Sequence, residues 1–118
     1  MDAQSIRLQE EKYRLLQRLA EIEVEQQRQQ GVFDAVPHYS VLETAAHRLG
    51  VELSCLTQQR AAREVAAANP AASACPQCGK KAAVEMSKRT VQSLDGTVEV
   101  LEPVAHCSAC RRAFFPSA

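Results

Sequence analysis

The sequence is poor in the residues that build large hydrophobic cores. Its 118 residues include no Trp, two Tyr and three Phe. A small segment with so few large apolar side chains rarely folds by burial alone, and a bound metal can replace the missing stability. The sequence also lacks a signal peptide and an apolar run that would span a membrane, because its amino terminus leads into charged residues. We therefore expect a cytoplasmic protein with no membrane partner.

An excess of charge is missing as well, since 14 Lys and Arg residues balance 14 Asp and Glu residues. The charges are nevertheless uneven along the chain. Residues 1–74 carry eight basic and ten acidic residues, whereas residues 75–118 carry six and four. A dedicated nucleic-acid-binding protein usually has a basic excess. Any contact with DNA is therefore expected to be local, or to be shared with sequence outside this chain.

Four of the five cysteines form two Cys-x-x-Cys pairs with 28 residues between them. Two intervening residues let both thiolates of a tight turn face one ion, and two such turns supply four sulfurs in a tetrahedron. The spacing predicts a structural Zn²⁺ site formed by Cys75, Cys78, Cys107 and Cys110. Two disulfides or a redox pair are the alternatives. A closed four-sulfur site has no open position for a substrate, so we do not expect an enzyme.

A first helix is predicted over about residues 3–30, with Gly31 as its C-cap. Its apolar residues recur at spacings of three, four and seven: Leu8, Leu15, Leu19 and Ile22. This stripe fits either a coiled coil that dimerises the protein or an amphipathic helix packed on the next helix of the same chain. We favour packing within the chain, because Lys12 and Gln26 occupy core positions and the repeat lasts only about three heptads.

A second helix is predicted over about residues 40–68, with a capping box formed by Ser40 and Glu43. Gly50 would allow a helix-turn-helix at this point. We favour one continuous helix, because the apolar face runs through the glycine without a change of phase and a helical Gly costs only about 1 kcal/mol. The two helices would form an antiparallel hairpin. Cys55, far from the two pairs, is expected to be a small buried apolar residue.

The remainder of the chain predicts a small β domain. Residues 69–74 are rich in small residues and read as a linker. Within residues 75–118, short strands flank Asp95 and Gly96, a pair that is typical of a two-residue hairpin turn. A hairpin that carries two cysteine turns is a zinc ribbon. The sequence therefore predicts an α+β protein with an amino-terminal helical hairpin followed by a β zinc ribbon.

The motifs resemble the zinc ribbon near the amino end of certain bacterial insertion-sequence transposases, the Kra group and its relatives. The resemblance is carried by Cys-Pro-x-Cys-Gly, by the hairpin, and by His-Cys-x-x-Cys-Arg-Arg-x-Phe-Phe-Pro over residues 75–116, and it extends loosely over residues 40–68. In that family a DDE catalytic domain follows the ribbon. The present sequence contains no such domain, so no strand-transfer chemistry is predicted. A fragment, a separately encoded piece and a stand-alone relative all fit this pattern.

The sequence is compatible with two functions. The resemblance implies a zinc-dependent DNA-binding module of a mobile element, with a transposase catalytic chain as a further partner. Phosphate contacts require cations, and the candidates lie near the cysteine turns and on the hairpin: Lys80, Lys81, Lys88, Arg89, Arg111 and Arg112. The balanced net charge favours the second function, a protein-interaction adaptor whose helices dock a partner or form a homodimer.

Overall fold

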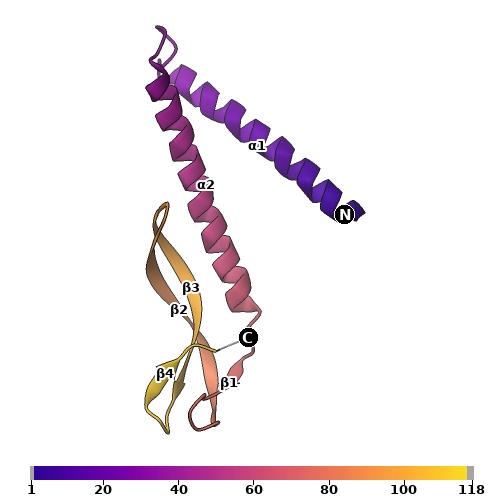
Figure 1. Cartoon of the computed structure of the whole chain (residues 1–118), viewed down its shortest axis with the longest axis vertical. Coiled ribbons are helices and arrows are strands. Elements are labelled where there is room, and N and C mark those ends of the chain that lie inside the picture. The colour runs from indigo at the N-terminus through magenta and orange to yellow at the C-terminus, as the bar shows by residue number, and fades with distance from the viewer. Residues whose placement is uncertain (1, 117–118) are drawn as a thin grey trace. The chain divides into compact units, whose positions relative to one another are not determined.

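The computed structural model describes residues 2–116 and confirms the α+β class, with two helices followed by a four-stranded antiparallel sheet (Figure 1). The chain forms two compact units, Met1–Leu49 and Gly50–Ala118. The linker that composition predicted, residues 69–74, therefore lies inside the second unit rather than at its border. Among the described residues, no helix combines the length and the apolar character that crossing a membrane requires.

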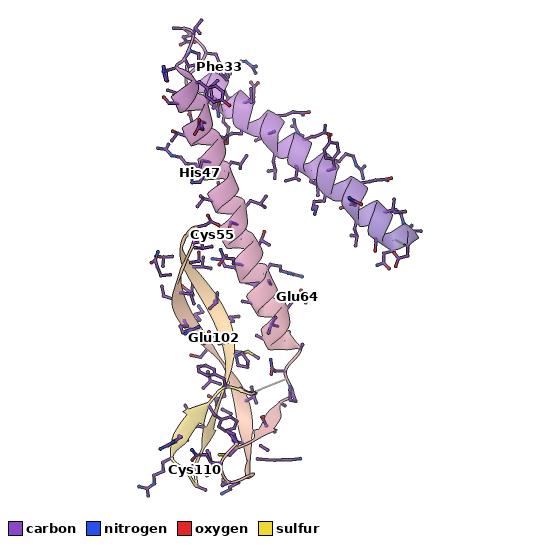
Figure 2. All side chains as sticks on the ribbon, in the orientation of Figure 1. Phe33, His47, Cys55, Glu64, Glu102 and Cys110 are labelled. Atoms are coloured by element: carbon purple, nitrogen blue, oxygen red, sulfur yellow. The ribbon has the colours of Figure 1, made fainter. Side chains whose placement is uncertain are left out.

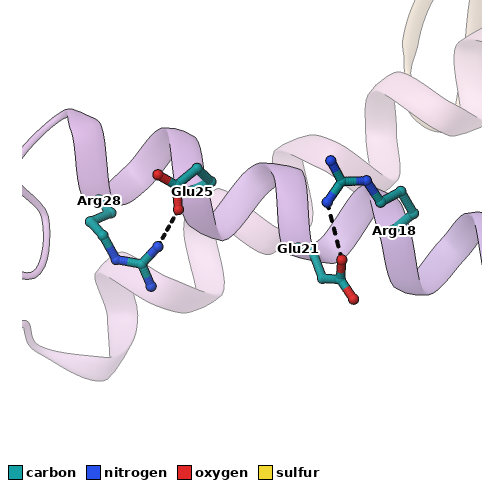
Figure 3. A network of polar contacts seen from close by, with 4 residues as sticks. All are labelled: Arg18, Glu21, Glu25 and Arg28. Atoms are coloured by element: carbon teal, nitrogen blue, oxygen red, sulfur yellow. Dashed lines mark hydrogen bonds and ion pairs between the residues drawn. The ribbon is translucent and has the colours of Figure 1, made fainter.

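Helix α1 spans Ala3–Gln29 and is closed by a local motif at each end. At its start the side chain of Asp2 accepts a hydrogen bond from the backbone N–H of Ser5 at 2.7 Å. At its end Gly31 has a φ of 81°, and the N–H of Val32 donates to the carbonyl of Gln27 at 3.0 Å. This is a Schellman motif, which confirms Gly31 as the stop signal. Two surface ion pairs lie along the helix, Arg18–Glu21 and Arg28–Glu25 (Figure 3).

Within the unit Met1–Leu49, the apolar stripe of α1 is largely uncovered. Leu8 and Leu15 remain 60% and 56% exposed. Within this unit, α1 and the next helix approach each other near the connector. Gln27 is buried there and shares a groove with Val41 and Thr44 of the next helix. The expected packing of the stripe on the second helix therefore does not occur within this unit.

Helix α2 spans Tyr39–Ala67 and continues through Gly50, as predicted. Its start differs from the predicted capping box of Ser40 and Glu43. The Nδ1 atom of His38 accepts from the backbone N–H of Ser40 at 3.2 Å and lies 2.8 Å from its hydroxyl. A histidine ring nitrogen thus takes the role that a Ser or Asp oxygen usually plays at a helix start. At the other end the Asn69 side chain donates to the carbonyl of Val65 at 2.9 Å.

The ribbon is one sheet in the order β1–β2–β3–β4. Two long strands, β2 (Lys81–Ser93) and β3 (Gly96–Cys107), replace the several short strands predicted. They pair from Ser93–Gly96 to Val84–Ala105. The turn therefore consists of Leu94 and Asp95, one residue earlier than the predicted Asp95 and Gly96, because Gly96 pairs with Ser93 and closes the ladder. The short strands β1 (Ala72–Ala74) and β4 (Arg112–Phe114) pair with the outer edges of β2 and β3 near the cysteines.

The core of the second unit is small. Its most buried residues include only one large aliphatic side chain, and two of the five are cysteines: Ala66, Cys75, Val98, Ala105 and Cys107. Phe114 is half-buried opposite Ala105, whereas Phe115 is 66% exposed. Because so little apolar surface is removed from water, we expect the stability of this unit to depend on the site formed by its cysteines.

Candidate metal centre

The fold brings the four predicted ligand cysteines together at one end of the ribbon. Their Sγ atoms all lie within 4.8 Å of one another, although the two pairs are far apart in sequence. Strand pairing explains this convergence. The N–H of Cys75 bonds to the carbonyl of Lys80 at 2.9 Å just before β2 begins, and Cys107 is the last residue of β3, opposite Arg112 of β4. Both cysteine turns therefore extend from the same end of the long hairpin.

The distances between the sulfurs fit a tetrahedral metal site. Four sulfurs about 2.3 Å from a central ion are separated by about 3.8 Å along each edge of the tetrahedron. The observed separations are 3.9 Å for Cys75–Cys110 and 3.5 Å for Cys78–Cys107. A disulfide has a bond of about 2.05 Å, and all five cysteines are free. The geometry therefore favours a metal ion over the two-disulfide alternative.

The surroundings of the sulfurs suit thiolates that are held by a cation. Backbone N–H groups of Cys78 and Gln77 point at the sulfur of Cys75 and lower its pKa to about 7. The neighbouring thiols of Cys78 and Cys75 raise the pKa of Cys110 to about 12. Four thiolates this close repel one another, so their common ionisation requires a positive ion between them.

Each cysteine turn is followed by a residue with a positive φ. The sequence indicates this conformation only for the first turn, where the residue is a glycine. Gly79 follows the second cysteine of the first turn and has a φ of 75°. Arg111 occupies the same place in the second turn and has a φ of 55°, the non-glycine exception among the described residues. The left-handed conformation crowds a Cβ atom against the backbone and costs a non-glycine residue about 1–2 kcal/mol. Arg111 therefore holds a strained position that glycine would fill without strain.

We expect Arg111→Gly to stabilise the metal-loaded ribbon by about 0.5–1 kcal/mol, because the relieved strain exceeds the added freedom of glycine in the unfolded chain. Denaturant unfolding, followed by release of the metal, measures the change. Arg112→Gly is the matched control. It removes the same charge from a strand position, so it should destabilise the ribbon instead. Destabilisation by both variants would contradict this account of Arg111.

A second polar cluster joins the end of the hairpin to α2 within the unit Gly50–Ala118. The Ser54 hydroxyl donates to Asp95 Oδ2 at 2.5 Å, and Gln58 Nε2 donates to Ser93 Oγ at 3.3 Å. We name these four residues the turn cluster. Cys55 lies beside it, with its Sγ 3.6 Å from the carbonyl oxygen of Asp95, at the opposite end of the ribbon from Cys110 (Figure 2). Cys55 is thus separate from the metal cluster, as predicted.

Sequence reasoning missed the turn cluster. Ser54 and Gln58 lie on α2, and a helical sequence pattern predicts no partner for either side chain. Nothing in a local pattern links them to a turn some 40 residues later, since that link depends on how α2 meets the hairpin. Several polar residues along one stretch of α2 are the only sign in the sequence of a polar contact there, and such a pattern predicts a specific partner poorly.

The six candidate cations fall into two groups. Lys88 and Arg89 lie on the hairpin and pair with carboxylates of the adjacent strand, Lys88 with Glu99 at 3.7 Å and Arg89 with Glu102. The other four are exposed and follow a cysteine turn within three residues, and no salt bridge between described residues includes them: Lys80, Lys81, Arg111 and Arg112. The unneutralised charge therefore lies at the metal end of the ribbon.

Comparisons of the chain with models of protein families, with curated proteins and with solved structures find no match. The assignment of the site therefore depends on its own geometry.

Proposed function

We propose that this protein binds Zn²⁺ as a structural ion and that its ribbon contacts DNA phosphates, as a non-catalytic module of a mobile-element protein. The single observation that supports the metal is the convergence of four sulfurs at tetrahedral distances. Zinc is the ion that such an all-thiolate site most commonly holds in proteins. Reduced, metal-bound cysteines are compatible with the cytoplasm.

The four unpaired cations support contact with nucleic acid. Lys80 and Lys81 follow the first cysteine turn, and Arg111 and Arg112 follow the second. Because the metal holds these turns together, cations that are distant in sequence become neighbours at one end of the ribbon. Lysine and arginine side chains in this arrangement suit a phosphate backbone, and they carry little information about base sequence.

The strain at Arg111 supports the same interpretation. A residue that costs stability in its backbone conformation is a candidate for a role outside the fold. The guanidinium group carries five N–H donors and binds phosphate in a bidentate manner, which neither glycine nor lysine can do. We therefore assign Arg111 the most important phosphate contact of the four.

The mobile-element context rests on motif resemblance alone. The residues that carry it are the four cysteines, the two arginines after Cys110, and the aromatic pair before Pro116. In the Kra group of insertion-sequence transposases such a ribbon precedes a catalytic domain, so a transposase catalytic chain is the partner that we propose. A closed four-sulfur site leaves zinc without an open position, and catalysis is accordingly not part of the proposed role.

A salt titration of DNA binding tests the proposal. We expect the zinc-loaded protein to bind random duplex DNA weakly, with a Kd of about 10⁻⁴ to 10⁻⁶ M, and a slope of log K against log salt of roughly −3 to −4 for four phosphate contacts. Changing Arg111 to Gly and Arg112 to Ala together should reduce the slope by about two units, because two contacts disappear. Fluorescence anisotropy of labelled DNA measures both proteins, and metal analysis verifies that zinc is retained.

Lys88→Ala with Arg89→Ala is the matched control, since it removes the same number of cations. These two side chains already pair with Glu99 and Glu102. Their loss should therefore change the slope by clearly less than the loss of Arg111 and Arg112. Equal slopes for wild type and the Arg111/Arg112 variant, or no binding at low salt, would count against DNA as the ligand.

The second candidate function is a protein-interaction adaptor. The exposed leucines of α1 favour it, because an uncovered apolar stripe on a long helix suits a protein partner. The balanced charge of the whole chain favours it as well. Failure of the DNA titration, with zinc still bound, would leave this as the function to pursue.

A further inference from the structure

Most of the apolar stripe of α1 remains uncovered within the unit Met1–Leu49. Leu8, Leu15, Leu19 and Ile22 are 60%, 56%, 36% and 39% exposed. Their spacing of seven, four and three residues places them in one seam of a helix that is 27 residues long and capped at both ends. A seam of this width matches the surface that a second helix covers in a two-stranded coiled coil.

The heptad positions of the seam can be assigned from the spacing. Leu8, Leu15 and Ile22 take position d, and Leu19 takes position a between Lys12 and Gln26. Polar residues at some a positions reduce stability but fix the register and favour a defined number of strands. Lys12 and Gln26 are therefore compatible with a two-stranded coiled coil, although their polarity alone disfavours one.

The charges beside the seam distinguish between the two possible orientations. In a parallel, in-register pair, position g of one helix faces position e of the next heptad in the partner. Arg18 then faces the partner's Glu23, and symmetry creates this attractive pair twice. Arg18 also contacts Glu21 of its own helix at 3.1 Å (Figure 3), and a guanidinium with five donors can bind both carboxylates.

The antiparallel arrangement is repulsive when the seams overlap fully. Placing Leu15 against the partner's Leu19 brings Arg18 opposite the partner's Arg18, and Glu11 opposite the partner's Glu25. Sliding one helix by a heptad removes this repulsion. It also places Ile22 opposite the partner's Ser5 in one direction, or moves Leu8 beyond the end of the partner helix in the other. The parallel pair keeps all four apolar residues of the seam in contact and pairs Arg18 with the partner's Glu23, and it also places Lys12 opposite the partner's Lys12, a cost that these contacts offset.

We propose that α1 forms a parallel, in-register, two-stranded coiled coil with a second copy of this chain. Leu15 and Leu19 form the centre of the seam, and Arg18 with the partner's Glu23 fixes the orientation. The proposal does not depend on DNA binding or on the metal. Its consequence is that two ribbons belong to one assembly.

Sedimentation equilibrium of the full chain over a concentration series tests the association. We expect a dimer for wild type, and dimerisation weaker by a factor on the order of one hundred or more for Leu15→Glu with Leu19→Glu, since two buried leucines per chain are lost. Val24→Glu is the matched control. Val24 lies on the same helix outside the seam and is 41% exposed, so its dimer should be unchanged. A monomeric wild type, or a leucine variant that still dimerises, would overturn the proposal.

Charge exchange provides a test that does not depend on the leucines. Arg18→Glu should weaken the dimer about tenfold, because two attractive pairs become repulsive. Adding Glu23→Arg should restore the affinity, since the exchanged pair is again complementary. Circular dichroism establishes that every variant remains helical. A double variant as weak as the single one would contradict the assigned pairing.

A cross-link tests the orientation. Ser5 lies at position a near the start of α1, so Ser5→Cys places two thiols face to face only in a parallel, in-register dimer. We expect a disulfide-linked dimer on mild oxidation, and none in the wild type treated in the same way, which carries the same native cysteines. A dimer that sediments normally but does not cross-link through residue 5 would exclude the parallel arrangement.

Discussion

Cys107→Ser is expected to abolish metal binding and to unfold the ribbon while α1 remains helical. Cys107 is 1% exposed, and its sulfur lies 3.5 Å from that of Cys78 and accepts from the N–H of Cys110 at 3.4 Å. A serine hydroxyl binds zinc far more weakly than a thiolate and leaves the tetrahedron incomplete. Structural zinc contributes about 10–16 kcal/mol in small domains, more than the few buried side chains of this unit replace.

Metal analysis and hydrogen exchange measure the two parts of this prediction. The zinc content should fall from about one per chain to near zero, and the amides of β2 and β3 should lose their protection. The second half of α2 should lose protection as well, because its partners Ser93 and Asp95 are then unfolded, whereas α1 lies in the other unit. Cys55→Ala is the control, since it removes a thiol outside the metal cluster and should leave zinc content unchanged. Zinc retained at wild-type level in Cys107→Ser would show that the site is misassigned.

After loss of the metal site, disruption of the turn cluster is expected to have the largest effect on the stability of the second unit. The Ser54 hydroxyl bonds to the Asp95 carboxylate at 2.5 Å, and both residues are half-buried. A hydrogen bond to a charged group contributes about 1.5–3 kcal/mol, and removing one partner leaves the other without its bond. Ser54→Ala and Asp95→Ala should therefore each destabilise the second unit by about 1.5–3 kcal/mol, Asp95→Ala more because it also alters the turn.

A double-mutant cycle separates the bond from other effects of each substitution. We expect a coupling energy of about 1–2 kcal/mol between Ser54 and Asp95, so the double variant should be clearly more stable than the sum of the single effects implies. Thr97 and Gln92 form a matched exposed pair, with the hydroxyl 2.9 Å from the amide oxygen and no link to α2. Their coupling should stay below about 0.5 kcal/mol. Additive effects at Ser54 and Asp95 would mean that the turn cluster does not tie α2 to the ribbon.

Features that depend on a short stretch of sequence were predicted well. The cysteine spacing identified the cluster, and Gly31, the continuity of α2 and the presence of a hairpin near Asp95 were visible because turn and cap chemistry is local. The turn itself was predicted one residue too late, at Asp95 and Gly96 instead of Leu94 and Asp95. The cap at the start of α2 was predicted wrongly. A Ser-x-x-Glu pattern is present, but the ring of His38 reaches the backbone first. Local patterns compete, and the sequence does not rank them.

Features that depend on distant residues were not predictable. The strand over Ala72–Ala74 looks like a linker, and it becomes a strand only because the edge of β2 lies beside it. The conformation of Arg111 is equally hidden, because arginine gives no sign of a positive φ and only the symmetry of the two cysteine turns imposes it. The pairing of Lys88 and Arg89 with carboxylates follows from the register of β2 and β3, which alternation alone leaves open.

The length of the β2–β3 hairpin has a consequence for the register of the sheet. Its turn at Leu94–Asp95 and its cysteines lie at opposite ends, with the ladder from Ser93–Gly96 to Val84–Ala105 between them (Figure 1). Hairpins form within about 1–10 μs, and a slip of one residue turns every side chain to the other face. Such a slip moves Cys107 by about 3.3 Å relative to Cys78, far beyond the roughly 0.2 Å that metal–ligand distances tolerate. A slipped ladder therefore cannot hold all four sulfurs at metal-binding distances, so we expect an ion bound by the four cysteines to retain only the correct alignment of the strands.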